Sequence, residues 1–136
     1  MKVKKVIIHA DGASRGNPGP AAIGATIRDE EGQLLAAISQ GIGWATNNQA
    51  EYRALIAALR KAVKLGATEA KVYLDSELIV KQINGRYRVR NRALKPLYQG
   101  VRKLQGLLRG SVVTHIPRQQ NVEADSLANA ALGAYF

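Results

Sequence analysis

The chain contains 136 residues, 46% of them hydrophobic, and its 20 Lys and Arg against 10 Asp and Glu give a formal net charge of +10. This length is typical of one domain with its own core, so we expect a single domain over residues 1–136. The absence of cysteine excludes disulfides and thiolate zinc sites, so that oxygen ligands and therefore Mg²⁺ or Mn²⁺ are favoured for any metal. The charge favours a nucleic acid or an acidic membrane surface as partner, although composition alone also fits a basic ribosomal component.

No run of about 18 apolar residues is present, which argues against a transmembrane helix. The basic start of the chain leads into a short apolar stretch that ends at His9 and Asp11, unlike a signal peptide. We therefore expect a cytoplasmic protein without a membrane segment. Nothing in the sequence indicates an obligate oligomer, so a monomer is expected.

The first third of the chain has the pattern of three β-strands. Residues 3–10 and 21–29 are apolar and carry β-branched side chains, and residues 34–41 follow a charged turn that ends at Gly32. Because the connections between these runs are short, we expect an antiparallel meander.

From Asn48 the apolar period changes to that of a helix, for which Gly66 is a C-terminal stop. Residues 70–74 and 112–116 predict two further strands, and Asn121 is expected to cap a last helix that runs to about Leu132. The resulting order is β-β-β-α-β-α-α-β-α, without a linker or repeat. Helical spacing is seen in Leu55, Ala58, Leu59, Ala62 and Val63, then in Leu78, Ile79, Gln82 and Ile83, then in Leu94, Leu97, Tyr98, Val101, Leu104 and Leu108.

Four carboxylates stand in short motifs of their own: Asp11, Glu51, Asp75 and Asp125. Asp11 and Asp75 are expected to end strands, and the other two to lie in the first turns of helices. Taken singly, each is more often a helix cap or a solvated charge. Strand ends and helix starts can converge on one edge of a sheet, where four carboxylates would repel one another without bound cations. Two divalent ions about 3.5–4 Å apart would relieve the repulsion and form a clamp for phosphodiester chemistry.

The motifs around these carboxylates read DGASRGNPGPA at residues 11–21, TNNQAE at 46–51, DS at 75–76 and NVEADSLA at 121–128. In this order, and over nearly the whole chain, they resemble the motifs of the ribonuclease H type 1 family. The resemblance implies an α/β ribonuclease H-like fold. Its mixed five-stranded sheet has three antiparallel strands, then two parallel additions, with helices on both faces.

The resemblance also implies an endonuclease that hydrolyses the RNA strand of RNA/DNA hybrids with two Mg²⁺ or Mn²⁺ ions. The products would carry 5′-phosphate and 3′-hydroxyl ends. By this similarity Asp11 bridges both ions and Asp125 completes the site of the ion that activates water. Glu51 and Asp75 hold the ion beside the leaving 3′-oxygen.

The loop at residues 12–20 holds three glycines and two prolines, which predicts a turn that permits close backbone approach to a ligand. The resemblance assigns Asn17 in this loop, together with Thr46, Asn47 and Asn48, to the hybrid. Amides can donate and accept at the 2′-hydroxyl that distinguishes RNA from DNA. The alternative for Asn47 and Asn48 is capping of the helix that carries Glu51, and the two roles are compatible.

The connection at residues 81–95 is basic and suited to phosphates and one stacked sugar or base, although a solvated basic loop is the alternative. Many type 1 enzymes carry a longer basic protrusion with tryptophans here, so this chain resembles a short form, and its only tryptophan, Trp44, lies elsewhere. The residues expected to contact substrate are Arg86, Tyr87 and Arg88, with Arg90 and Arg92 beside them.

Many relatives place a histidine in a loop before the last carboxylate, where it assists catalysis or product release. His115 is the match by count, but residues 112–116 predict a strand that would fix it. We therefore favour Arg118, a cation that can approach the scissile phosphate. His9 is expected to pack on the sheet rather than to bind metal.

Two other functions fit the same sequence. One is a hybrid-binding module without catalysis, against which the retention of all four carboxylates argues. The other is a nuclease of the same fold that also acts on double-stranded RNA, for which the missing protrusion leaves room. Parallel assays on hybrid and on duplex RNA separate these functions.

Overall fold

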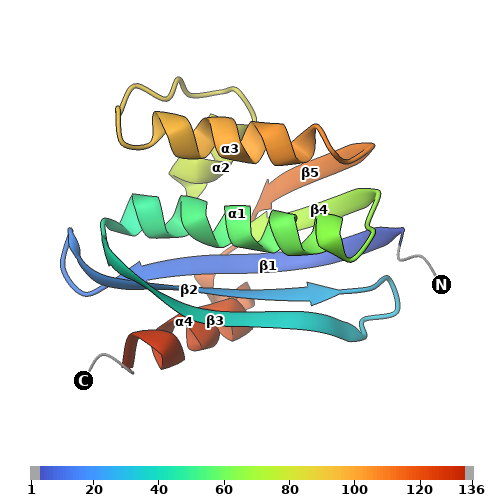
Figure 1. The fold of residues 1–136 in the computed structure, drawn as a ribbon, viewed down its shortest axis with the longest axis horizontal. Helices are drawn as coiled ribbons and strands as arrows, with labels where there is room; N and C mark the ends of the chain where they lie inside the picture. Colours follow the sequence, from blue (N-terminus) through green and yellow to red (C-terminus); the bar gives the residue numbers. More distant parts are fainter. Residues whose placement is uncertain (1–3, 134–136) are drawn as a thin grey trace.

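One mixed sheet organises the protein (Figure 1). The structure, a computed structural model, describes residues 4–133. The strand order is β3-β2-β1-β4-β5, in which β1, β2 and β3 pair antiparallel and β4 runs parallel to both of its neighbours. This arrangement confirms the expected sheet. The strands are β1 (Lys5–Ser14), β2 (Gly19–Arg28), β3 (Leu34–Ala45), β4 (Glu69–Leu74) and β5 (Gly110–His115).

Helices cover both faces of the sheet. Helix α1 packs on β1 and β2, with α3 beside it, whereas α4 packs on β1, β2 and β3 from the opposite side (Figure 1). The expected order of elements is confirmed. The helices are α1 (Asn47–Lys64), α2 (Glu77–Ile83), α3 (Lys95–Gln105) and α4 (Val122–Gly133), and a short 3₁₀ helix, η1 (Arg118–Gln120), precedes α4.

The main hydrophobic core lies between the sheet and α1. Alternate residues of β1, namely Val6, Ile8 and Ala10, are fully buried there, as the two-residue period of a strand requires. The fully buried Tyr52 of α1 donates its hydroxyl to Gln82 Oε1 of α2 at 2.7 Å. This hydrogen bond satisfies two buried polar groups and ties α1 to α2 directly beside Glu51.

The first hairpin is tighter than the sequence indicates. Strand β1 continues to Ser14 and β2 begins at Gly19, so the predicted loop at residues 12–20 shrinks to a turn at residues 15–18. The antiparallel ladder of β1 and β2 runs to the pair Ser14–Ala21, and this pairing extends the strand through glycine-rich sequence. Asp11 therefore lies inside β1 and does not end it. The predicted start of this strand at Val3 lies outside the described residues.

Two further boundaries differ from the prediction. Strand β3 runs past residue 41 to Ala45, because Gly43 takes a φ of 81° at a bulge and pairing with β2 resumes beyond it. Helix α3 ends at Gln105, although the apolar spacing continues to Leu108. Leu108 is buried in the core from the turn that leads to β5. Within residues 4–133, no helix has the length and apolar character needed to cross a bilayer.

Gly24 marks a close approach of α4 to the sheet, and its replacement by alanine tests this packing. A Cβ at Gly24 would lie 2.2 Å from the Ala124 carbonyl oxygen and 2.5 Å from the Ala128 nitrogen. Both are backbone atoms, so the helix must move. We expect Gly24→Ala to lower the free energy of unfolding by about 1–3 kcal/mol in urea denaturation.

Gly100→Ala is the matched control for this change. A Cβ at Gly100 in α3 would meet only Ile56 Cδ1, at an ordinary contact distance of 3.5 Å. Because alanine favours a helix over glycine, we expect this variant to be neutral or stabilised by up to about 1 kcal/mol. Equal loss of stability in the two variants would contradict the packing described here.

Candidate active site

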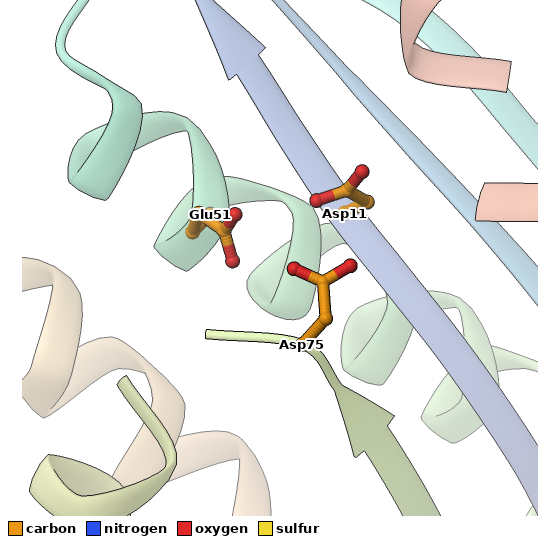
Figure 2. A group of neighbouring side chains, drawn as sticks. All are labelled: Asp11, Glu51 and Asp75. Atoms are coloured by element: carbon orange, nitrogen blue, oxygen red, sulfur yellow. The ribbon is translucent and has the colours of Figure 1, made fainter. Parts of the chain in front are cut away.

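Three of the four predicted carboxylates converge at one edge of the sheet. Ligand oxygens of Asp11, Glu51 and Asp75 all lie within 4.8 Å of one another, and Figure 2 shows the side chains facing a shared space. Asp11 comes from β1, Glu51 from α1, and Asp75 directly follows β4. The parallel pairing of β1 and β4 ends at the rung His9–Tyr73, and each aspartate lies two residues beyond it. The register of the two strands thus sets Asp11 beside Asp75.

Glu51 reaches this cluster because the start of α1 lies against β1. A Cβ at Gly12 would be 2.2 Å from the Ala50 carbonyl carbon and 2.4 Å from the Glu51 nitrogen. The glycine-rich motif predicted a close backbone approach to a ligand. In the structure, the backbone that approaches Gly12 is that of α1. Only a glycine next to Asp11 permits Glu51 to come this close.

A capping box fixes where α1 begins. The Thr46 hydroxyl accepts from the Gln49 N–H at 3.1 Å, and the Thr46 N–H donates to Gln49 Oε1 at 2.8 Å. Thr46 is therefore the cap, and the alternative capping role of Asn47 and Asn48 is wrong because both already lie inside the helix. This start places Glu51 in the second turn rather than the first.

Asp75 is held by a side chain from the other end of the chain. Asn121 Nδ2 donates to Asp75 Oδ2 at 2.9 Å and to the Ala10 carbonyl oxygen at 3.0 Å. Asn121 stands at the predicted cap position directly before α4, where its carbonyl oxygen accepts from the Asp125 N–H at 3.1 Å. Its side chain does not cap the helix, because Oδ1 is buried and accepts no hydrogen bond within the described residues. The sequence predicted that Asn121 precedes the last helix, but it did not predict the side-chain hydrogen bonds to Asp75 and Ala10.

Asp125 and Arg118 line the same cleft as the three converging carboxylates. Asp125 is in the first turn of α4 and is close enough to Asp11 to affect its titration, but it is not one of the three converging carboxylates. Arg118 lies in η1, with its Nη2 at 4.0 Å from Asp125 Oδ1 and 81% of its side chain exposed. An exposed pair at this distance adds little stability, so the guanidinium is available to an incoming anion.

The four predicted carboxylates and Arg118 line one cleft of about 530 Å³. Asn47 also lines it, as expected for a substrate contact. Ser14, Arg15, Asn129 and Leu132 line it without having been singled out from the sequence. Of these four, only Asn129 could have been predicted from the sequence, because it lies one helical turn after Asp125 and therefore on the same face of the helix. In the structure its Nδ2 donates to the Asp125 carbonyl oxygen at 2.9 Å.

Residues 9–131 match a family model described as reverse transcriptase-like. The chain is 50% identical over 131 residues to the bifunctional protein Rv2228c of Mycobacterium tuberculosis, covering 96% of this chain and 36% of that protein. It is 44% identical over 127 residues to ribonuclease HI of Halobacterium salinarum, covering 92% of this chain and 64% of that protein. The chain thus spans less than two thirds of the length of these curated relatives.

Solved structures agree in fold over nearly the whole chain. RNase H1 from the halophilic archaeon Halobacterium salinarum is 42% identical, with a TM-score of 0.93, and covers 96% of this chain and 98% of its own. LC11-RNase H1 in complex with an RNA/DNA hybrid is 42% identical, with a TM-score of 0.91 and the same coverage. The chain belongs to the ribonuclease H type 1 family.

In this ribonuclease H type 1 chain, hydrogen bonds of Asn17 and Asn47 tie the turn at residues 15–18 to α1. The Asn47 N–H donates to Asn17 Oδ1 at 3.0 Å, and the Ser14 N–H donates to Asn47 Oδ1 at 3.0 Å. Asn17 and Asn47 are exposed and Asn48 is half-buried. Unlike Asn47, neither Asn17 nor Asn48 is among the described residues that line the cleft. These bonds hold the first hairpin against the start of α1.

The expected substrate residues of the basic connection do not reach the cleft. Arg86, Tyr87 and Arg88 lie between α2 and α3, all exposed. Lys81 Nζ sits 4.9 Å from the centre of the Tyr87 ring and donates to its hydroxyl at 3.2 Å. One part of the ring is thus covered by a lysine, whose ammonium group also pairs with Glu77 Oε1 at 2.7 Å.

The two histidines lie apart from the carboxylate cluster. His9 stacks on Tyr73 with ring centres 5.1 Å apart, in agreement with the packing expected for it, and burial lowers its pKa. His115 is the last residue of β5, paired with Leu74, and is not among the described residues that line the cleft. Of the two alternatives from the sequence, the structure brings Arg118 to the site.

Burial and mutual repulsion change the titration of the cluster. Burial first, and then the charges of Asp75 and Asp125, raise the pKa of Asp11 from 3.8 to about 7. Burial followed by the charge of Asp11 raises the pKa of Glu51 well above its usual value, against the weaker opposing effect of Arg118. The cluster therefore retains a proton near neutral pH or needs cations to lose it.

These shifts predict how the stability of the metal-free protein depends on pH. Because the pKa of Asp11 is higher in the folded state, the folded protein binds more protons than the unfolded chain between about pH 4 and pH 7. Stability therefore falls as the pH rises through this window. We expect a loss on the order of 2 kcal/mol between pH 5 and pH 8 in urea denaturation with EDTA.

Asp11→Asn should shrink this loss, because the variant removes one of the two titrating groups. Glu30→Gln, an exposed change in the turn after β2, is the control and should leave the loss unchanged. Wild-type stability that rises with pH over this window would contradict the raised pKa values.

Proposed function

We propose that this chain is an endoribonuclease that hydrolyses the RNA strand of RNA/DNA hybrids and leaves 5′-phosphate and 3′-hydroxyl ends. The observation that carries the proposal is the convergence of Asp11, Glu51 and Asp75 in an open cleft, with Asp125 and Arg118 at its side. Membership of the ribonuclease H type 1 family and the hybrid bound to the related LC11-RNase H1 support the choice of substrate.

The cluster fits divalent cations of the Mg²⁺ or Mn²⁺ type. Its ligands are carboxylate oxygens, which these ions prefer. Glu51 Oε2 is buried and has no hydrogen-bond partner within the described residues, and the raised pKa values of Asp11 and Glu51 reflect charge that is not compensated by the protein. Asp11, Glu51 and Asp75 would hold one ion, and Asp11 with Asp125 would hold a second.

The residues of the cleft have different roles in the proposed hydrolysis. When bound, the two ions supply the acidity that generates the attacking hydroxide and stabilises the leaving oxygen. Asp11, Glu51, Asp75 and Asp125 orient those ions and carry the compensating negative charge. The Arg118 guanidinium, exposed beside Asp125, can donate to a non-bridging oxygen of the scissile phosphate. No side chain needs to form a covalent bond with the substrate.

Substrate contacts flank the cluster on one side. Asn47 lines the cleft, and the hydrogen bond from its backbone N–H holds Asn17 next to it. We assign these amides, with Thr46 and Asn48, to the 2′-hydroxyls and backbone of the hybrid. Arg86, Tyr87 and Arg88 lie farther away, and we assign them to phosphates of the duplex beyond the scissile bond.

Removal of one carboxylate tests the reaction. We expect Asp75→Asn to lower cleavage of a labelled RNA/DNA hybrid in Mg²⁺ or Mn²⁺ by at least about a thousandfold, because several kcal/mol of charge stabilisation would be lost. EDTA should abolish cleavage by the wild type. Glu69→Gln, at the opposite end of β4, should retain wild-type activity.

Parallel substrates decide between this function and its two alternatives. A wild-type protein that binds the hybrid but cuts nothing with either ion would be a binding module. Comparable cuts in duplex RNA would establish the broader nuclease.

Arg118→Ala tests the auxiliary cation. We expect kcat to fall about tenfold to a hundredfold, with little change in KM, because the guanidinium would act on charge that develops in the transition state. His115→Ala should change kcat by less than about twofold. The opposite pattern, with loss only in His115→Ala, would transfer the role to the histidine.

A further inference from the structure

Asn121 is the most deeply buried polar side chain beside the carboxylate cluster, and the mechanism proposed above does not use it. Only 1% of the residue is exposed. Its amide nitrogen donates to the Ala10 carbonyl oxygen at 3.0 Å and to Asp75 Oδ2 at 2.9 Å. A side-chain amide has two N–H donors, so both are used.

The surroundings fix the orientation of this amide. Both partners of Nδ2 are oxygens that can only accept, and a flipped amide would place its own oxygen against a carbonyl and a carboxylate. In the observed orientation, Asn121 Oδ1 is buried and accepts no hydrogen bond from any described residue. The fold therefore leaves one acceptor unsatisfied, while one donor binds Asp75 in the cluster and the other binds the backbone directly before Asp11.

The backbone of Asn121 links the cluster to the last helix. Its carbonyl oxygen accepts from the Asp125 N–H at 3.1 Å, and its own N–H donates to the Arg118 carbonyl oxygen at 3.0 Å. Ala10 directly precedes Asp11. One residue thus connects the segments that carry Asp11, Asp75 and Asp125, which are far apart in sequence.

We propose that Asn121 is a positioning residue that holds the Asp75 carboxylate and the start of α4 in the geometry that binds divalent ions. The role rests on the proposed function, since the ions are those of the ribonuclease site. Without the amide, repulsion within the cluster would turn Asp75 away from Asp11 and Glu51. With it, one oxygen of Asp75 is anchored before any ion arrives, which lowers the cost of ordering the ligands.

A purely structural role for Asn121 makes a different prediction. If the amide only joined α4 to the sheet, its loss would lower the melting temperature without a specific effect on ions. Asn84 offers a matched control, because its Nδ2 also donates to a backbone carbonyl, that of Val113 at 3.0 Å, and it is not among the described residues that line the cleft.

The test is calorimetric titration of Mn²⁺ into wild type, Asn121→Ala, Asn121→Ser and Asn84→Ala, each checked by circular dichroism for folding. We expect Asn121→Ala to weaken Mn²⁺ binding by about 10–100-fold, as is typical when a partner of a metal ligand is lost. Asn121→Ser, which can donate one hydrogen bond, should be intermediate, and Asn84→Ala should bind as the wild type does. A folded Asn121→Ala with an affinity within about twofold of the wild type would overturn the role.

If the variants fail to fold, NMR titration of the wild-type protein with Mg²⁺ tests the same role. The side-chain amide resonances of Asn121 should shift on Mg²⁺ titration with the same midpoint as the backbone amide of Asp75, and resonances that do not respond would overturn the role. A wild type that neither binds Mn²⁺ nor cuts the hybrid would overturn the proposed function together with this inference. A wild type that does both, beside Asn121 variants that bind Mn²⁺ equally well, would overturn the inference alone.

Discussion

The parallel register of β1 and β4 is the constraint on which the site depends. Because the two strands run in the same direction, the residues that follow their last shared rung, His9–Tyr73, emerge at the same edge of the sheet. Asp11 and Asp75 are placed there by backbone hydrogen bonds, not by attraction for each other. A slip of the register would separate these two like charges and dismantle the cluster.

Close approaches of helix backbone to the sheet then bring in the remaining acidic side chains. Gly12 allows the backbone of α1 to pack closely against β1 next to Asp11, and Gly24 allows α4 to pack closely against β2. Glu51 and Asp125 are thus carried inward on rigid helices rather than on mobile loops, which favours precise placement. The free energy gained when the two helices pack onto the sheet offsets the repulsion among these carboxylates.

The apolar periodicity of the sequence predicted the helices and strands more accurately than it predicted where they end or what they contact. The helix from Asn48 and the strands at residues 70–74 and 112–116 were predictable because their apolar periods are regular. The extension of β1 past Asp11 was not, since it depends on pairing with β2 across a glycine-rich turn. The convergence of Asp11, Glu51 and Asp75 was expected from their places at strand ends and a helix start, and from the family resemblance. The hydrogen bonds of Asn121 could not be predicted, because their partners lie 111 and 46 positions away in the chain.

The proton retained by the cluster has a consequence for how the protein responds to its surroundings. Ligand carboxylates must be deprotonated to bind a cation, so cation binding at neutral pH would displace the protons held by Asp11 and Glu51. Acidification and depletion of divalent ions would therefore act on the site in the same direction. Such a site would respond to the ratio of free cation to proton concentration, and not to the concentration of either one alone.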